Sequence, residues 1–394
     1  MTRYCGAIIF SALSVALAAA PAHSLQDDWP ESGPLSTVEF RFSADAALVF
    51  AAADYGGSTL ADLDLGFEWE GISDNGWRWG ADIGLQAQAD SPRDGFANQA
   101  ANAAPPRRSL ATGRYTGGAP EGGGEAFAAS RASLFLRTGW GELRAGLTPG
   151  AAALETVPMP TGSAFLRLDG GPLATPYGAA IRTLNAASGL GPTLVYTTPR
   201  IVGLSASASF TPQTRYCGID FCTPGASAAG PASARLDSVF EGALSFDHTF
   251  DSVGRVRLGA NIAFADPASP AFSQDYAAYG LQARWSQNGW NAGLSALWSD
   301  NAVSGGRYSA VMTALRYDFG DWSVGAEWAR AEDDFLGEDQ TATQFTISRL
   351  VGDAHSVAFG LHDIETDLAS NQPLAIGING RNGVGVFLEI AVSR

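Results

Sequence analysis

Apolar and polar side chains alternate residue by residue along most of this sequence. Between Leu63 and Trp69 the odd positions hold leucine, phenylalanine or tryptophan, and the even positions hold aspartate, glycine or glutamate. Successive side chains of a β-strand point to opposite faces, so the pattern predicts strands with an apolar environment on one face and water on the other. After the hairpin signal Ser73-Asp74-Asn75-Gly76 the alternation resumes at Trp77.

The alternation recurs to the end of the chain, where Val384, Val386, Leu388, Ile390 and Val392 share one face. We count about sixteen such segments, separated in turn by short turn signals and by longer polar stretches. The predicted long loops lie near residues 51–60, 91–126, 148–190, 211–235, 266–275, 299–307, 331–341 and 364–381. Short turns at one end and long loops at the other are typical of an outer-membrane barrel.

A soluble β-sandwich also alternates, but its strands usually have about 5–6 residues. The segments here run for roughly 8–12 residues, the length that a tilted strand needs to cross a bilayer. Aromatic side chains stand beside the predicted turns, as expected at a lipid–water boundary. They are Trp69, Trp77, Trp79, Trp140, Trp285, Trp290, Phe319 and Trp322. Since lipid cannot hydrogen-bond an open strand edge, the sequence predicts an all-β fold, a closed antiparallel transmembrane β-barrel with short periplasmic turns and long extracellular loops.

Composition agrees with this interpretation and excludes others. Charged residues make up 16% of the 394 residues, below the average of about 25% for soluble domains. The net charge of -16 argues against nucleic-acid binding, which needs a basic face. All 24 basic residues are arginines, whose charge no accessible pH removes; a compositional bias of the lineage would also explain this.

The first 24 residues read as a secretory signal peptide, and residues 25–394 as the barrel. Arg3 supplies the positive start and Ala7 to Ala20 the apolar run, with small residues around Ala20-Pro21-Ala22 or Ala22-His23-Ser24 for cleavage. This run is too short to cross a bilayer as a helix, which takes roughly 20 residues. The segment predicts secretion through the inner membrane, and the barrel predicts a final location in the bacterial outer membrane.

Two local motifs carry a resemblance to a known family. The first is Gly139-Trp140-Gly141-Glu142-Leu143-Arg144-Ala145-Gly146, and the second is Tyr196-Thr197-Thr198-Pro199-Arg200 followed by Gly203-Leu204. In this order, and over nearly the whole mature chain, the sequence resembles the general diffusion porins of Gram-negative bacteria, especially those of the alphaproteobacterial type.

The resemblance implies a sixteen-stranded barrel, a homotrimer, and a third loop folded inward to narrow the pore. The chain departs from the family pattern at two places. It ends in Val392-Ser393-Arg394 rather than in an aromatic residue, and its third loop reads Val157-Pro158-Met159-Pro160-Thr161-Gly162 instead of the family's Pro-Glu-Phe-Gly-Gly run.

Fixed charges in a narrow aqueous passage decide which ions enter it. The loop over 148–190 is long enough to fold back into the lumen and is the candidate constriction loop; it carries Glu155, Arg167, Asp169 and Arg182. The inward register of the first five strands supplies Arg41, Arg78, Arg131, Arg137 and Arg144. The resemblance implies that a wall cluster, here Arg41, Arg78, Arg131 and Arg144, faces the acidic loop groups Glu155 and Asp169. The alternative is that all of these are solvated lumen charges.

Acidic residues outnumber arginines on the inward register, and we therefore expect a modest cation preference. The further inward arginines are Arg255, Arg257, Arg284 and Arg316. The inward acids are Glu39, Asp45, Asp62, Asp64, Glu68, Glu70, Asp82, Glu142, Glu241, Asp247, Asp318, Glu327 and Glu389.

Other chemistry finds little support in the sequence. Cys217 and Cys222 lie in a long loop that faces an oxidising compartment, so a local disulfide is the ordinary interpretation. A zinc site would need four ligands and no histidine lies nearby, so we expect neither a metal nor a cofactor. The mature chain's histidines show no nucleophile elbow and no metal spacing, and an enzyme is not predicted.

The sequence thus predicts a water-filled channel in membrane lipid for passive diffusion of ions and small hydrophilic solutes, and the family resemblance implies two further copies of the chain as partners. Two alternatives stay open. One is a substrate-selective channel on the same barrel, which would show an aromatic slide or an arginine ladder. The other is a structural or adhesive barrel with a plugged lumen, which inward glycines such as Gly80, Gly259 and Gly293 disfavour if they leave space open.

Overall fold

Sixteen antiparallel strands close into one barrel, which confirms the predicted fold class. The computed structural model describes residues 35–53, 56–90, 107–108, 115–116, 124–169, 173–174, 181–189, 191–214, 236–267, 274–335, 337–368 and 383–393. The expected signal peptide at 1–24 and the expected disulfide between Cys217 and Cys222 lie outside these residues.

Fourteen of the barrel strands have 10 to 19 residues. In the order of their pairing the barrel strands are β1 (Leu35–Ala53), β2 (Gly56–Ser73), β3 (Arg78–Asp90), β6 (Gly124–Thr138), β7 (Gly141–Leu147), β10 (Pro192–Thr197), β11 (Leu204–Gln213), β12 (Leu236–Phe250), β13 (Gly254–Pro267), β14 (Tyr276–Gln287), β15 (Trp290–Ser299), β16 (Tyr308–Phe319), β17 (Trp322–Asp333), β18 (Glu338–Val351), β19 (His355–Leu368) and β20 (Gly383–Ser393). Strands β7 and β10 are shorter than predicted, with 7 and 6 residues. Two short pairs stand apart from the barrel, β4 (Arg107–Arg108) with β5 (Tyr115–Thr116) and β8 (Leu166–Arg167) with β9 (Leu173–Ala174).

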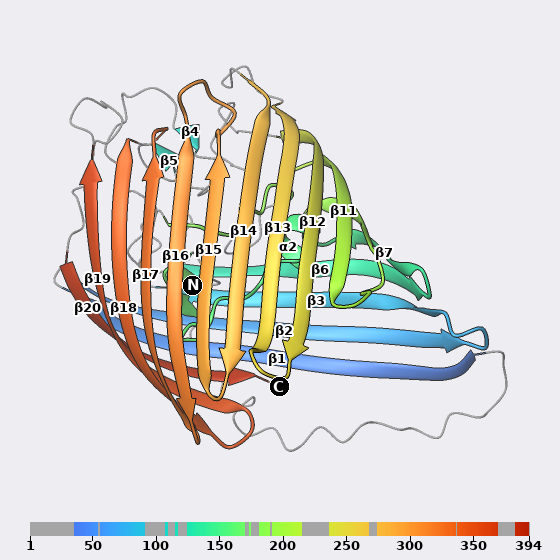
Figure 1. Ribbon diagram of the computed structural model, residues 1–394, viewed down its shortest axis with the longest axis horizontal. Coiled ribbons are helices and arrows are strands. Elements are labelled where there is room, and N and C mark those ends of the chain that lie inside the picture. Colours follow the sequence, from blue (N-terminus) through green and yellow to red (C-terminus); the bar gives the residue numbers. More distant parts are fainter. Residues whose placement is uncertain are drawn as a thin grey trace.

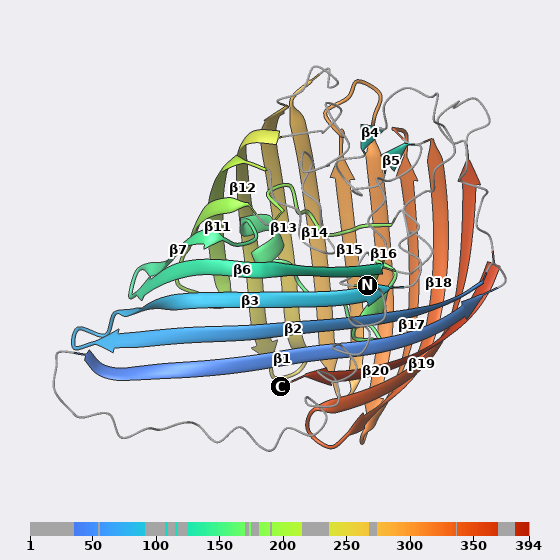
Figure 2. The same ribbon diagram turned by 180° about the vertical axis from the view of Figure 1, so that it is seen from behind.

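Each barrel strand pairs with the next, and β1 pairs with β20 from Asp45↔Ser393 to Ala53↔Gly385. The front wall of β12 to β19 crosses the rear wall of β1, β2, β3 and β6, as tilted strands on opposite sides of a barrel must (Figures 1 and 2). Closure gives each strand a neighbour on both sides, which is the condition for a sheet to lie in hydrocarbon, although residues 35–44 of β1 extend past the end of β20 and pair with β2 alone.

The alternating sequence gives the barrel two chemically different faces. Leu134 is 66% exposed and Phe135, the next residue, is 4% exposed, because the first side chain points outward and the second into the barrel. The same register exposes Phe42, Leu244, Leu281, Phe345 and Leu388 on the outside. These are the apolar positions that the sequence assigns to lipid.

Aromatic rings gather where the hairpins turn. Trp69 and Trp79 meet edge to face at 4.8 Å between centroids, and Trp290 lies 4.6 Å from Tyr317. Arg349 is on the outward register, but it lies near the turn at Gly352 with its guanidinium 5.2 Å from the Trp322 ring. An arginine there avoids the bilayer midplane, where it would cost about 2–4 kcal/mol.

The hairpin between β14 and β15 shows how turn residues set the register. Gln287 pairs with Trp290, so only Asn288 and Gly289 form the turn. Their φ angles of 50° and 83° belong to the left-handed region that a two-residue turn of this twist needs, and asparagine and glycine tolerate it best.

Two loops are shorter than the sequence predicts. The loop expected over 51–60 shrinks to residues 54–55 between β1 and β2, and the loop expected over 331–341 to residues 334–337 between β17 and β18. The loop over 51–60 was predicted too long because residues 51–58 are mostly alanine, glycine and serine. These small residues differ little in hydrophobicity, so a strand built from them shows no alternating pattern. Among the residues that the structure describes, no helix is long and apolar enough to cross a bilayer.

Candidate functional site

The chain after β7 turns into the barrel and follows its inner wall. We call residues 148–169 the loop strap. It begins with the one-turn helix α2 (Ala151–Leu154), which lies inside the ring of strands beside β12 and β13 (Figure 1). The backbone N–H of Ala152 donates to Glu241 Oε2 at 3.0 Å, and that of Ser188, on the returning segment, donates to Glu241 Oε1 at 2.9 Å. One buried carboxylate on β12 thereby ties the two ends of the loop together.

The strap then crosses the wall strand by strand. Glu155 accepts hydrogen bonds from Ser207 of β11 (2.7 Å) and Ser245 of β12 (2.6 Å). Further along, Arg284 of β14 donates to the Pro158 carbonyl at 3.3 Å, and Arg316 of β16 donates to the Thr161 carbonyl at 3.1 Å. Polar wall side chains therefore satisfy strap backbone groups that would otherwise be left without partners.

The tip of the strap is held by one carboxylate of β20. Glu389, which is 1% exposed, accepts the backbone N–H of Ala164 at 2.8 Å, of Phe165 at 3.2 Å and of Leu166 at 3.0 Å, and also the Ser163 hydroxyl. A buried charge is tolerated only when hydrogen bonds replace its water, and these donors do so. Gln344 of β18 adds a bond to the Leu166 carbonyl at 3.0 Å.

Glycines on the inner wall make room for the strap. A Cβ on Gly293 would lie 2.4 Å from Pro160 Cδ, and a Cβ on Gly325 would lie 3.2 Å from Gly162 Cα. A Cβ on Gly259 would lie 3.2 Å from Val157 Cγ2. The expectation that such glycines leave open space is wrong for these positions, because the strap fills it.

An apolar layer completes the attachment. Met159, Leu168 and Ile181 of the loop pack in one buried cluster with wall residues that include Leu297 and Met312. Leu166 packs in a second cluster with Phe387 of β20 and Val49 of β1. The strap thus spans the wall from β11 round to β1 and leaves the wall of β2, β3, β6 and β7 facing the lumen.

That facing wall carries a continuous network of ion pairs. Arg131 bridges Asp82 (2.7 Å) and Asp64 (3.2 Å), and Arg144 bridges Asp82 (3.3 Å) and Glu142 (3.0 Å). Arg137 joins this group through Glu142 at 2.5 Å.

The network extends to β1 and towards the turn end. Arg137 also pairs with Glu70 at 2.9 Å, and Arg78 pairs with the other Glu70 oxygen at 3.2 Å. Arg41 reaches Glu39 at 3.1 Å and Glu68 at 3.9 Å. Five arginines and six carboxylates are linked in this way, so the network itself carries one excess negative charge, and the inward acids Asp45 and Asp62 lie on the same wall.

The structure brings the five wall arginines of the predicted site together and separates them from the predicted loop acids. Glu155 bonds to serines of β11 and β12, and Asp169 pairs with Arg167 at 3.4 Å within the loop. Among the described residues no ion pair joins Glu155 or Asp169 to the wall arginines. Arg182 lies on the returning segment, where its backbone N–H donates to the Tyr308 hydroxyl at 2.8 Å. The role of these residues as a constriction stays a prediction.

Sequence reasoning missed the residues that hold the loop. Glu241, Glu327 and Glu389 were assigned to the lumen by their inward register, but they are 4%, 2% and 1% exposed. Glu327 accepts from the Gly162 backbone at 3.3 Å. Strand parity carried no signal for this role, because the residues directly across from these acids are small, polar or apolar residues such as Ser209, Ala314 and Ala358.

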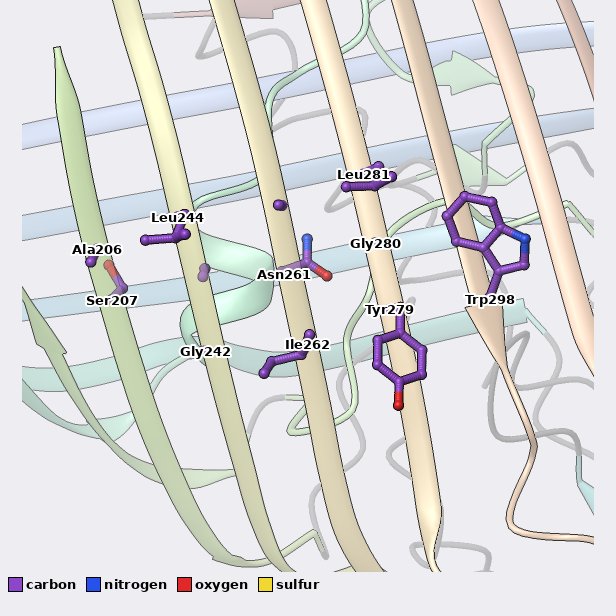
Figure 3. A pocket seen from close by; sticks show the side chains of 12 residues that line it. Ala206, Ser207, Gly242, Leu244, Asn261, Ile262, Tyr279, Gly280, Leu281 and Trp298 are labelled. Carbon is purple, nitrogen blue, oxygen red and sulfur yellow. The ribbon is translucent and has the colours of Figure 1, made fainter.

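A shallow groove of about 560 Å³ lies in the wall formed by β11 to β15 (Figure 3). Its lining includes the outward side chains of Leu244, Ile262 and Leu281, with Gly242 between them. An apolar surface on the outward register suits hydrocarbon, so we do not assign this groove to the aqueous passage. Within the described part of the chain, no three His, Cys, Asp or Glu side chains converge in a way that would hold a metal ion.

Comparisons with known proteins agree with this geometry. The sequence profile of the family described as Gram-negative porin matches residues 11–379. No curated protein sequence matches the chain. The fold is similar to that of an anion-selective porin from Comamonas acidovorans, with a TM-score of 0.57, 12% identity, and coverage of 91% of this chain and 100% of that one.

Two further solved structures are similar in fold. One is a loop L8 deletion mutant of OmpT, an outer membrane protein of Vibrio cholerae, with a TM-score of 0.54, 10% identity, and coverage of 91% of this chain and 99% of that one. The other is a porin refined at 1.8 Å resolution, with a TM-score of 0.53, 15% identity, and coverage of 90% and 100%. At these identities the likeness shows the fold alone.

Proposed function

This chain belongs to the Gram-negative porin family and forms a diffusion channel in the outer membrane, and from that premise we propose where its aqueous passage runs. The passage lies between the loop strap and the charged wall of β1, β2, β3, β6 and β7. Ions and small hydrophilic solutes cross it down their gradients, without a cofactor or energy input. The family and fold are those of a channel rather than of an enzyme.

One observation carries this proposal. The strap is bonded and packed along the inner wall from β11 to β1 instead of standing across the barrel, and the opposite wall keeps partly exposed charges such as Arg78, at 51%, and Arg137, at 33%. Charged side chains that are half exposed within a barrel need water around them. A wet wall opposite a firmly attached loop favours an open passage over the plugged barrel.

Recordings from refolded protein in a planar bilayer test the proposal. We expect stable, ohmic conductance steps in KCl, because the passage holds water and the loop strap beside it is bonded to the wall. A barrel that inserts but stays silent would instead be the plugged alternative.

The selectivity of the channel between cations and anions depends on the charges that line the passage. The expected modest cation preference counted Glu241, Glu327 and Glu389 as lumen charges, and these three carboxylates bond to the loop instead. The cation preference stays a prediction, supported by the acidic excess of the facing wall, where Asp45 and Asp62 add to the one excess negative charge of the ion-pair network. Zero-current potentials in a KCl gradient measure it directly, and an anion preference would reject it.

We also propose that the channel assembles as a homotrimer in membrane lipid. The support is the family resemblance together with the outward apolar face, on which Phe40, Phe42 and Phe67 are 63%, 64% and 42% exposed. Unheated samples on a denaturing gel should migrate as a species about three times the size of the boiled chain. Migration as a folded monomer would remove the trimer and leave the channel itself intact.

A further inference from the structure

A second group of arginines lies on the wall that carries the strap, towards the turn end of the barrel. Arg255 and Arg257 of β13, Arg284 of β14 and Arg316 of β16 all have the inward register. Arg257 and Arg284 are direct partners across the two strands. Like charges placed directly opposite each other destabilise a sheet, so this pair calls for a compensating group.

The carboxylates nearby compensate only part of the charge. Asp247 pairs with Arg255 at 2.5 Å and with Arg257 at 3.2 Å, and Asp318 pairs with Arg316 at 2.7 Å. Arg284 bonds only to neutral acceptors, the Pro158 carbonyl at 3.3 Å and Asn291 Oδ1 at 3.1 Å, and in the described part of the chain no carboxylate lies within ion-pair distance of it.

The surroundings leave a net positive charge on this wall. The positive charges of Arg257, Arg316 and Arg255 repel that of Arg284, and the negative charge of Asp318 attracts it. Arg200, between β10 and β11, adds a fifth arginine that bonds to the Gly203 carbonyl and the Ser245 hydroxyl. Against these five arginines stand Glu155, Asp247 and Asp318, which leaves an excess of two positive charges.

Space is available beside the excess charge. A cavity of about 210 Å³ opens between the start of the strap and the wall, and Thr156, Pro158, Arg200, Asp247 and Arg257 are among its lining residues. The Arg257 side chain is 28% exposed, and Arg284 is bonded to the carbonyl of Pro158, one of the lining residues. Partners on neighbouring strands stand about 5 Å apart, a span that one tetrahedral oxyanion can bridge.

We propose that Arg200, Arg257 and Arg284 form a binding site for small polyvalent oxyanions of the phosphate class, at the cavity between the start of the loop strap and the wall. The guanidinium fork matches phosphate oxygens in pairs of hydrogen bonds, and several forks around one anion favour a polyvalent ligand over chloride. The site rests on the proposed function, because the anion reaches it through the aqueous passage. It differs from the ion-paired arginine network of β1, β2, β3, β6 and β7 because Arg284 has only neutral acceptors and the arginines around it outnumber the carboxylates.

The test uses pyrophosphate as the probe and two independent measurements. In planar bilayers with symmetric KCl, added pyrophosphate should lower the single-channel conductance of the unsubstituted protein, and the effect should saturate with concentration. Titration calorimetry on the refolded, detergent-solubilised protein should give binding without any need for conductance. Arg284→Gln should weaken the apparent affinity by about 10-fold or more, which corresponds to about 1.4 kcal/mol, and Arg284→Lys by less.

The matched control is Arg349→Gln, which removes an arginine of the outer face near the same end of the barrel. It should leave pyrophosphate binding unchanged, and a heat-shifted band on a gel verifies that each variant is folded. Channels that conduct normally but neither bind nor respond to pyrophosphate would overturn the site and leave the proposed function standing. An Arg284→Gln variant that binds pyrophosphate as tightly as the unsubstituted protein would also overturn the proposed oxyanion site. Channels that fail to conduct would count against the proposed function alone, since calorimetry still decides the site.

Discussion

Glutamates on the inward register have two different roles in this barrel. Glu68 and Glu142 lie in the ion-pair network and keep a quarter of their side-chain surface exposed, at 25% each. Glu389 is buried and accepts backbone N–H groups of the strap. Parity along a strand cannot distinguish these cases, because it reports only the face on which a side chain lies. What covers that face depends on a loop more than 200 residues away in sequence.

Replacing Glu389 should loosen the tip of the strap. Glu389→Ala removes the acceptor of three backbone N–H groups and one hydroxyl, and a hydrogen bond to a charged group contributes about 1.5–3 kcal/mol. We expect noisy, fluctuating conductance and faster proteolysis within residues 160–170. Glu389→Gln keeps one acceptor oxygen and should be milder. As a control, Glu39→Gln alters an exposed acid of β1, and quiet channels in all three variants would show that Glu389 does not hold the strap.

A substitution at Arg137 tests whether permeating ions pass along the facing wall. It pairs with Glu70 and Glu142 and lies over the Phe135 ring at 4.3 Å. Arg137→Ala removes one positive charge from a wall that already carries excess negative charge. The zero-current potential should therefore shift in the direction of stronger cation selectivity. Arg330→Ala removes an arginine of the outward register that pairs with Asp339, and it should leave the potential unchanged. An unaltered potential in Arg137→Ala would mean that permeating ions do not pass this wall.

At the scale of elements, the strap and the glycines beneath it belong together. Strands β13, β15 and β17 each present an inward glycine where the strap crosses, and the wall side chains around these glycines bind the strap backbone. The sequence predicted a long loop over 148–190 and its inward fold, but it could not predict the path along the wall. That path depends on matching a loop to seven or more strands at once, and no local pattern records such a match.

Filling a glycine under the strap should displace it. A Cβ at Gly293 would already lie 2.4 Å from Pro160 Cδ, so Gly293→Val forces the strap away from β15 and towards the lumen. We expect a lower single-channel conductance. Gly139→Val places the same side chain in the β6–β7 turn, where no atom lies within 4 Å, and should conduct normally. Equal conductance in the two variants would contradict the close packing of the strap against β15.

At the scale of the whole molecule, the strand pattern and the closure of the barrel were predictable from sequence, and the distribution of charge was not. Alternation in segments such as Leu63 to Trp69 specifies the two faces directly, because each side chain has one choice of face. Whether Arg257 meets Arg284 or a carboxylate depends on the register between strands, which turn geometry sets one hairpin at a time. A change of one residue in that register would have paired the arginine with a different neighbour.

The barrel requires hydrocarbon outside its wall and water inside it, and thiol accessibility along β2 measures this arrangement. In a background with Cys217→Ser and Cys222→Ser, each residue from Leu63 to Glu68 is replaced by cysteine, one at a time. A charged, membrane-impermeant methanethiosulfonate reagent is then applied to the channel in lipid. We expect fast modification for Asp64→Cys and Glu68→Cys, whose positions face the lumen, and protection for Leu63→Cys, Leu65→Cys and Phe67→Cys. Equal rates at all positions, or fast modification of the odd ones, would contradict the arrangement described here.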